Sequence, residues 1–267
     1  MSGADASTKT QTGTGAERGT SKDGTLDRGN ERPPTTSDAQ GLAPVSTTTT
    51  ASTGGAAGTV TSTVGGAPQI GESQLIGFER QLDWKKDFVP VEKPAPGPGE
   101  WVDAAETFAG IGPVEVNLVL VADSKPPVFR LVDNMIVRIT HDSKRSWRAT
   151  WIQSKPKAVR ERLLHHEQRH YDIAALIGRD FFLELMQLKR RTYENQAALQ
   201  RDLETLNSSI RSKAQAVQNR YDEDTEHGKK QDQQDRWDKM IEAAGIEAAY
   251  TQKKPLLEVL GAAGITF

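Results

Sequence analysis

The sequence predicts an α+β domain that follows a long disordered N-terminal segment. Residues 113–122 and 128–140 alternate between apolar and polar side chains, and this period of two is typical of strands. After Pro156 the apolar residues recur mostly at helical spacing as far as Leu188, which is typical of a long amphipathic helix. We therefore expect a small antiparallel sheet, followed by one long helix and further helices.

The N-terminal quarter of the chain differs in composition from the rest. Residues 1–68 are mainly Thr, Ser, Gly and Ala, and no aromatic residue precedes Phe78. Such a segment buries too little apolar surface to offset the entropy lost on ordering, so we predict disorder over 1–68. A solvated tail or linker is the favoured role, and a leader for export is the alternative. The single domain is expected over 69–267.

The expected sheet and helices follow one another along this domain. Turn residues at 123–127 separate the two alternating segments and predict a hairpin or meander. Residues 192–220 are polar and lack Pro and Gly, which indicates more helix that doubles back, with 207–209 as a candidate turn. Gly228 ends this region, and 231–244 is predicted to form a shorter helix.

Composition excludes several classes of function. The formal net charge of −2 gives no signal for nucleic acid binding. The chain has no cysteine, so a bound metal would need histidine and carboxylate ligands. No stretch approaches the roughly 18 apolar residues of a membrane helix, and we expect no membrane association. No apolar signal-peptide segment is present, so we expect a protein that is cytoplasmic as synthesised, with export by a non-classical route left open.

The most informative motif is His166-Glu167-Gln168-Arg169-His170. Two histidines four residues apart on a helix project from one face and can bind the same zinc ion. Glu167, beside the first of them, can then accept a proton from a zinc-bound water as general base. The alternative is a pair of core histidines, but it does not explain an adjacent carboxylate, because a buried carboxylate without a partner is costly.

The third ligand is less clearly indicated. His165 points about 100° away from its neighbour on the helix and cannot easily share the ion. The remaining candidates are two histidines and two glutamates: His141, His227, Glu184 and Glu194. We favour His227, which lies in a polar loop after the helices, although a solvated loop histidine is the simpler interpretation. Leu176 occupies the position of the third histidine in the extended metzincin motif, which excludes that subclass.

Three weaker candidates accompany the motif. Asp172 is equally well interpreted as a residue that orients a liganding imidazole or as a surface aspartate. The acidic residues 222–224 lack the spacing of a calcium loop, and a solvated face is favoured. Tyr221 could donate a hydrogen bond to an oxyanion, although no spacing rule supports it.

The residues around the motif resemble a bacterial family of predicted secreted zinc-dependent proteases. The resemblance runs from about Leu82 to Ile241 and rests on three blocks, which are residues 163–174, Ser146-Trp147, and a C-terminal block with Tyr221-Asp222, Thr225, His227-Gly228, Gln234 and Trp237. It implies zinc ligands at His166 and His170, a general base at Glu167, and a third ligand at His227. Arg169 stands where members of the family usually have Gly, and the usual export signal is missing.

The sequence therefore predicts a zincin-like metallopeptidase with Zn²⁺ as cofactor and a protein or peptide as substrate. The oligomeric state is not indicated. Two alternatives stay open at this point: a metal-binding or structural interaction module without hydrolytic activity, and an exported effector whose N-terminal segment is the loading signal.

Overall fold

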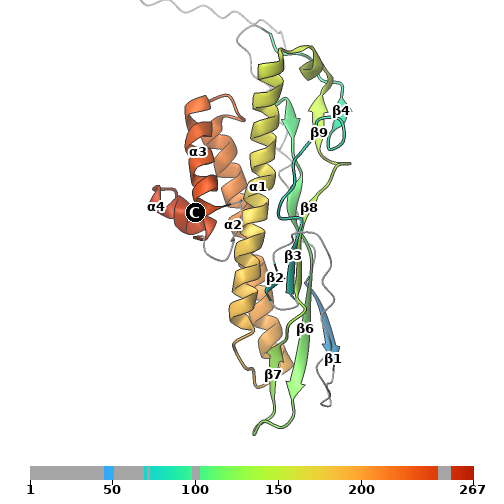
Figure 1. Cartoon of the computed structure of the whole chain (residues 1–267), viewed down its shortest axis with the longest axis vertical. Coiled ribbons are helices and arrows are strands. Elements are labelled where there is room, and N and C mark those ends of the chain that lie inside the picture. The colour runs from blue at the N-terminus through green and yellow to red at the C-terminus, as the bar shows by residue number, and fades with distance from the viewer. Residues whose placement is uncertain (1–44, 51–68, 71–72, 98–102, 246–253) are drawn as a thin grey trace, which may run out of the picture. The chain divides into compact units, whose positions relative to one another are not determined.

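The computed structural model describes residues 45–50, 69–70, 73–97, 103–245 and 254–267 (Figure 1). Within them the chain forms two sheets and four α-helices, which confirms the predicted α+β class.

The larger sheet has the order β1-β6-β8-β3-β2, with β7 paired to β6. Its strands are β1 (Val45–Thr50), β2 (Gln69–Ile70), β3 (Ser73–Ile76), β6 (Ala109–Val121), β7 (Val128–Leu131) and β8 (Ile136–His141). The smaller sheet has the order β4-β9-β5 and consists of β4 (Val89–Val91), β5 (Ala105–Glu106) and β9 (Trp147–Ala149).

Both sheets are mixed, whereas the sequence predicted an antiparallel sheet. The expected hairpin is present, because β7 and β8 both pair antiparallel with β6. Three other pairs are parallel, namely β1 with β6, β3 with β8, and β4 with β9. Parallel partners come from segments that are distant in the chain, so the local alternation in 113–140 could not reveal them.

Strand β1 lies inside the segment that was predicted to be disordered. Val45–Thr50 pairs in parallel with Val114–Val119 of β6, so the prediction is wrong for these six residues. The physical reason is that Val and Thr are β-branched and favour extended backbone, and that a sheet edge supplies hydrogen bonds without requiring an apolar core. The rest of 1–68 lies outside the described residues.

The helices follow the sheets in the chain. After a 3₁₀ turn, η1 (Thr150–Ser154), come α1 (Lys157–Leu188), α2 (Gln196–Thr225), α3 (Gln231–Ala244) and α4 (Leu256–Ala262). The candidate turn at 207–209 is wrong, because α2 passes through it without a break. The chain reverses earlier, where the Asn195 side chain accepts a hydrogen bond of 2.9 Å from Ala198 N and so caps α2.

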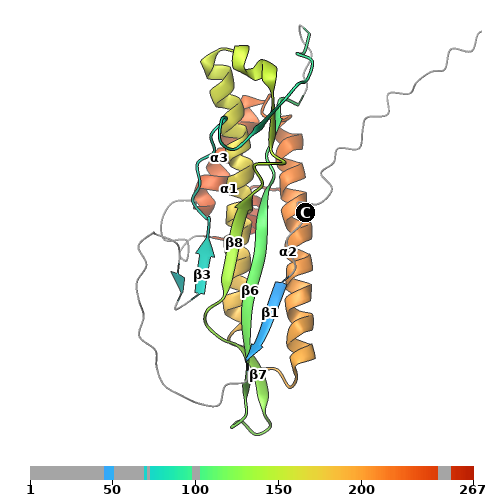
Figure 2. The same cartoon turned by 90° about the vertical axis from the view of Figure 1, so that its right-hand side faces the viewer.

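Helix α1 is the central layer of the domain. It packs against β6 and β8 on one side and against α2 and α3 on the other (Figures 1 and 2). Gly178 lets α1 approach the sheet closely, because a Cβ at this position would collide with the Ile139 side chain. The middle of α1 is therefore buried on nearly every side, and polar residues there need internal partners. Among the described helices, none is both long and apolar enough to cross a membrane.

Candidate metal centre

Three side chains from two helices converge on one point. His166 and His170 project from α1, and Asp222 projects from the last turns of α2. The two histidine Nε2 atoms are 3.3 Å apart, and Oδ1 of Asp222 lies 3.2 Å from the first and 2.9 Å from the second. Ligand atoms about 2.05 Å from a shared ion are separated by about 2.9 Å at 90° and about 3.3 Å at the tetrahedral angle. The three atoms are therefore spaced as metal ligands.

Two glutamines set the orientation of the imidazoles. Nδ1 of His170 lies 2.6 Å from Oε1 of Gln218, whose amide nitrogen donates to the His170 carbonyl oxygen at 2.9 Å. Nδ1 of His166 lies 3.2 Å from Oε1 of Gln234, which also accepts the Tyr221 hydroxyl at 2.8 Å. Because each amide presents its oxygen, each Nδ1 must be the donor. In neutral imidazoles, both Nε2 atoms then carry a lone pair directed at the centre.

The centre lacks positive charge when the imidazoles are neutral. Oδ1 of Asp222 is buried and has no hydrogen-bond partner among the described residues, and it faces the two Nε2 lone pairs. Burial alone would lower the pKa of His170, but Asp222 outweighs it and raises that pKa to about 9. Burial would raise the pKa of Asp222, but the two imidazoles hold it well below its usual range. The arrangement demands a cation at this point, which is either a proton or a metal ion.

Glu167 contributes a further unpaired oxygen beside this group. Its side chain is buried, and Oε2 has no hydrogen-bond partner in the described part of the chain. Its charge contributes to the raised pKa of His170. Glu106 on β5 lies close enough for the two carboxylates to interact: burial is the main cause of its raised pKa, and the charge of Glu167 adds to it. Oε2 of Glu106 accepts a hydrogen bond of 2.8 Å from the Trp147 indole.

The Tyr221 ring packs against the buried side of the metal centre. Its ring stacks on His166 with a centroid distance of 4.7 Å and an interplanar angle of 19°. The residue is fully buried, and its hydroxyl donates to Gln234, so the suggested role as oxyanion donor does not fit this position. Gly228 lies against the same imidazole: a Cβ there would be 2.9 Å from Cγ of His166, and its φ is +78°. A residue other than glycine would push the imidazole out of place.

His227, the favoured third ligand, lies at the edge of the centre. It is outside the group of three converging atoms, and its side chain is 41% exposed. Its Nδ1 lies 3.6 Å from Oδ1 of Asp222 and 3.9 Å from Oδ1 of Asp103. Glu226 and His227 both have positive φ, 47° and 53°, in the turn that ends α2. This conformation costs of the order of 1 kcal/mol or more per residue, and it places the imidazole beside Asp222.

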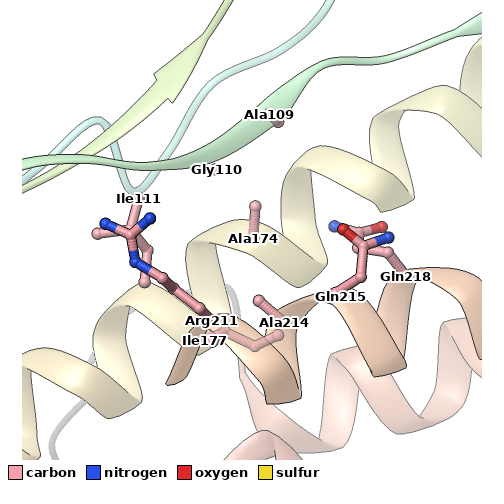
Figure 3. A pocket seen from close by; sticks show the side chains of 9 residues that line it. All are labelled: Ala109, Gly110, Ile111, Ala174, Ile177, Arg211, Ala214, Gln215 and Gln218. Carbon is pink, nitrogen blue, oxygen red and sulfur yellow. The ribbon is translucent and has the colours of Figure 1, made fainter. Parts of the chain in front are cut away.

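Gln218 links the centre to a pocket between β6, α1 and α2. The pocket is formed by Ala109, Gly110 and Ile111 of β6, Ala174 and Ile177 of α1, and Arg211, Ala214, Gln215 and Gln218 of α2 (Figure 3). Its walls are mainly apolar where strand and α1 meet, and the polar side chains come from α2. A group that enters this pocket reaches the glutamine that orients His170.

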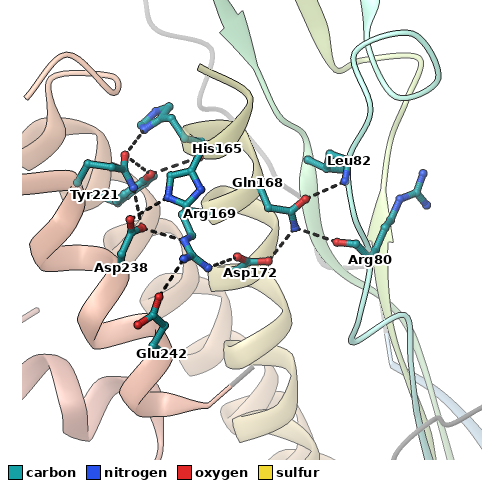
Figure 4. Close-up of polar contacts among 11 residues, drawn as sticks. Arg80, Leu82, His165, Gln168, Arg169, Asp172, Tyr221, Asp238 and Glu242 are labelled. Atoms are coloured by element: carbon teal, nitrogen blue, oxygen red, sulfur yellow. Dashed lines mark hydrogen bonds and ion pairs between the residues drawn. The ribbon is translucent and has the colours of Figure 1, made fainter. Parts of the chain in front are cut away.

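A polar network between α1 and α3 adjoins the metal centre, because Gln234, which contacts His166, donates a hydrogen bond of 3.0 Å to Asp238 (Figure 4). Arg169 donates to Asp172 and Asp238 at 2.8 Å each, and His165 Nε2 lies 2.8 Å from Asp238. Arg169, which stands where members of the family usually have Gly, therefore points toward α3 and does not enter the metal centre. His165 points away from the centre, as predicted.

Asp172 does not orient an imidazole. It is buried, and its carboxylate accepts hydrogen bonds of 2.8 Å from Gln168 and Arg169. Neither suggested role fits, since the residue is also not a surface aspartate. The reason is its position two residues after His170, which turns it about 200° around α1 and away from the metal centre.

The other ligand candidates also lie outside the converging group. His141 lies at the end of β8, where its Nε2 is 2.9 Å from Ser146 Oγ. Glu184 is on α1, beyond the middle of the helix, and Glu194 lies between α1 and α2. Neither glutamate is in the group of three.

Sequence reasoning missed Asp222 as a ligand and the two orienting glutamines. A signal for part of this set is present in α2. Gln218, Tyr221, Asp222 and Thr225 recur at the spacing of one helix face, and three of them are buried. Polar side chains on the buried face of a helix need hydrogen-bond partners inside the protein, which could have indicated a site. The acidic residues next to Asp222 instead favoured the interpretation of this segment as a solvated face.

The comparisons with known proteins agree in part with the expected resemblance. Residues 136–228 match the model of a family described as a bacterial protein of unknown function (DUF922). This range includes His166, Glu167, His170 and Asp222, and it ends at Gly228. No curated protein and no solved structure matches the chain. The chain is thus similar to a bacterial family over the metal centre, and the match supplies no activity.

Proposed function

We propose that this protein is a zinc-dependent metallopeptidase whose zinc is held by His166, His170 and Asp222. The observation that carries the proposal is the convergence of two Nε2 atoms and one carboxylate oxygen beside a further buried carboxylate, Glu167. Two histidines and one carboxylate leave a fourth position open, which is the arrangement of catalytic rather than structural zinc. The predicted resemblance to zinc-dependent proteases supports the choice of peptide bonds as the substrate.

Zinc bound there would supply a Lewis acid that polarises a carbonyl group and makes a water molecule more acidic. The protein's own contribution is the base. Glu167 accepts the proton of the attacking water through its unpaired oxygen and later delivers it to the leaving amine. Gln218 and Gln234 keep both imidazoles in the Nδ1–H form throughout, so their Nε2 atoms stay available.

A Glu167→Gln variant of the full chain tests this assignment. Zinc content and the hydrolysis of an unfolded protein such as denatured casein are measured for both forms, with a set of random-sequence peptides as further substrates. We expect about one zinc per chain in both, and hydrolysis only with glutamate at position 167, with a loss of at least about 100-fold. Hydrolysis that persists in the variant would exclude the proposed base.

One observation favours a second candidate, a structural or interaction module without hydrolytic activity. His227 Nδ1 is 3.6 Å from Asp222 Oδ1, so its imidazole is near enough to complete a four-ligand site. A closed site with four protein ligands is typical of structural zinc. In that case the His227→Ala variant would lose zinc, and no substrate would be hydrolysed by the unmodified protein.

A further inference from the structure

The solvent-accessible side of the metal centre is lined by His227. His166 and His170 are buried, Asp222 is partly exposed, and the His227 side chain is the most exposed of the four. Tyr221 covers the opposite side, where its ring stacks on His166 and meets His170 edge to face. A substrate therefore reaches the open coordination position from the side on which His227 lies.

The imidazole of His227 has an unused hydrogen-bond donor. Its Nδ1 lies 3.6 Å from Oδ1 of Asp222 and 3.9 Å from Oδ1 of Asp103, and both distances are too long for a hydrogen bond. Neither ring nitrogen forms a hydrogen bond with another of the described residues. Two carboxylate oxygens near Nδ1 favour the tautomer that carries the proton there. The imidazole thus presents an N–H group beside Asp222.

The turn that follows α2 holds this imidazole in place at a conformational cost. Glu226, His227 and Gly228 have positive φ in succession, 47°, 53° and 78°. Only glycine adopts this region without strain, yet the first two positions carry larger residues. The turn is tied to the centre, because His227 N donates a hydrogen bond of 3.1 Å to the Asp222 carbonyl oxygen. Strain of this kind is typical of functional sites.

We propose that His227 is a catalytic residue, whose Nδ1–H donates a hydrogen bond to the substrate oxygen that becomes negatively charged during hydrolysis. The inference rests on the proposed peptidase function. In that reaction water adds to the scissile carbonyl carbon: a C–O bond forms, the π electrons of the carbonyl move to its oxygen, and Glu167 accepts the proton of the water. The charge on the oxygen persists until the carbonyl re-forms, the C–N bond breaks and Glu167 delivers the proton to the amine.

A donor aimed at this oxygen stabilises the transition state more than the substrate, because the charge is present only after water has added. Neighbouring ligand atoms of a tetrahedral zinc are about 3.3 Å apart. An N–H group 3.6 Å from the Asp222 ligand oxygen therefore lies beside the ligand shell, next to the open position. The Tyr221 hydroxyl is committed to Gln234, so His227 is the donor that the accessible side provides.

Two substitutions of the full chain separate the donor from the rest of the side chain. His227→Ala removes the N–H group. His227→Asn keeps one, because the amide nitrogen of asparagine can take the place of Nδ1, and asparagine tolerates positive φ. Zinc content and circular dichroism are measured first for both variants. The kcat and KM are then measured with the random-sequence peptide that the unmodified protein cleaves fastest.

A binding measurement accompanies the kinetics. Calorimetry on zinc-loaded protein gives the affinity for an N-phosphoryl leucyl-phenylalanine dipeptide, whose tetrahedral, anionic phosphoryl group resembles the charged intermediate. The matched control is the mercaptoacetyl derivative of the same dipeptide, which binds zinc through sulfur and has no tetrahedral oxygen group.

We expect His227→Ala to keep its zinc and to lower kcat by at least about 100-fold, with KM within about threefold. Its affinity for the phosphoryl dipeptide should fall by a similar factor, and its affinity for the mercaptoacetyl dipeptide should stay within about threefold. His227→Asn should lie within about tenfold of the unmodified protein in every measurement. Loss of zinc in His227→Ala, equal losses in both variants, or an unchanged kcat in His227→Ala would each overturn the proposal.

Failure of the proposed function gives a different pattern. If the unmodified protein hydrolyses none of the peptides, the peptidase assignment fails, and calorimetry alone decides the role of His227. An affinity for the phosphoryl dipeptide that falls in His227→Ala and is retained in His227→Asn would support the donor at this position. No binding of the phosphoryl dipeptide, or binding that is equal in all three proteins, would overturn it.

Discussion

Nε2 of His170 lies 2.9 Å from Oδ1 of Asp222, although the two residues belong to different helices. The contact joins the His166–His170 segment of α1 to the end of α2 and belongs to the candidate metal centre. Without a metal, a proton on the imidazole supplies the missing charge, and the negative charge of Asp222 raises the pKa of His170 to about 9, against the effect of burial. With a metal bound, the ion takes the place of that proton.

Replacing Asp222 by Asn is expected to weaken zinc binding by more than about 100-fold, because it removes a charged ligand. Replacing His227 by Ala is expected to change the affinity by less than about threefold, since its imidazole lies outside the converging group. Competition with a chromogenic chelator measures the zinc affinity of both variants. His166→Ala is the positive control for loss of a ligand, and Glu223→Gln is the control at an exposed residue next to Asp222. Loss of zinc in the His227 variant would contradict the ligand set and favour the closed site.

The orienting role of Gln218 predicts a difference between two substitutions. Gln218→Met removes the acceptor for His170 Nδ1, and zinc affinity should fall by about 10–100-fold. Gln218→Glu keeps an acceptor oxygen, and the affinity should stay within about threefold of the original. Circular dichroism checks that both variants are folded. If the two variants bind zinc equally weakly, the glutamine acts through packing and not through orientation of the imidazole.

Gly228 predicts a local steric effect on the same centre. Gly228→Ala introduces a Cβ 2.9 Å from Cγ of His166 at a φ of +78°, so we expect a loss of about 1–3 kcal/mol in the free energy of unfolding and weaker zinc binding. The matched control is Gly261→Ala, in α4, where a Cβ meets nothing within 4 Å and stability should be equal or slightly higher. Urea unfolding in the presence of a chelator measures the stability. If the Gly228→Ala variant has unchanged stability and zinc affinity, the turn that follows α2 can shift to make room for the added Cβ.

The coupled pair His170 and Asp222 predicts how the metal-free protein responds to pH. The pKa of His170 is about 9 when folded and about 6.5 when unfolded, so the folded state binds more protons between these values. Stability from this group is therefore complete below about pH 6.5 and decreases by about 3 kcal/mol as the pH rises through 9. The lowered pKa of Asp222 has the opposite sign: its contribution is present above about pH 4 and is lost on further acidification.

Urea unfolding with a chelator between pH 5 and 9 measures this dependence. Asp222→Asn should remove the decrease above pH 6.5, because it removes the charge that raises the pKa of His170. Zinc affinity should rise over the same range, since the ion displaces a proton. A flat stability profile for the unmodified protein between pH 6.5 and 9 would contradict the coupling.

Arg169 predicts an effect on stability without an effect on the metal. Arg169→Met leaves Asp172 buried without its charged partner, and we expect a loss of about 3 kcal/mol in the free energy of unfolding. Zinc affinity should be unchanged, because the guanidinium faces Asp172 and Asp238. Arg201→Met, at an exposed position of α2, is the control and should lie within about 0.5 kcal/mol. Reduced zinc binding in the folded Arg169 variant would contradict this expectation and show that the residue acts on the centre through Asp238 and Gln234.

Local patterns were sufficient for the longest strand and for the long helices. The period-two alternation in 113–140 predicted the strands β6 and β8, and the helical spacing after Pro156 predicted α1. Both are consequences of which side chains share a face, and that is a property of neighbouring residues. The same patterns did not reveal the parallel pairing of β1 with β6, because its partners are distant in the chain and the tail segment has no apolar periodicity.

For the metal centre, the sequence by itself determined that His166 and His170 share one face of a helix with Glu167 between them. Helical geometry over four residues is enough for that conclusion. Only the tertiary structure decided that Asp222 completes the group, that Gln218 and Gln234 orient the imidazoles, and that Arg169 points to α3. These contacts depend on how α2 and α3 pack around α1, and the packing is set by the whole core, not by any local spacing of residues.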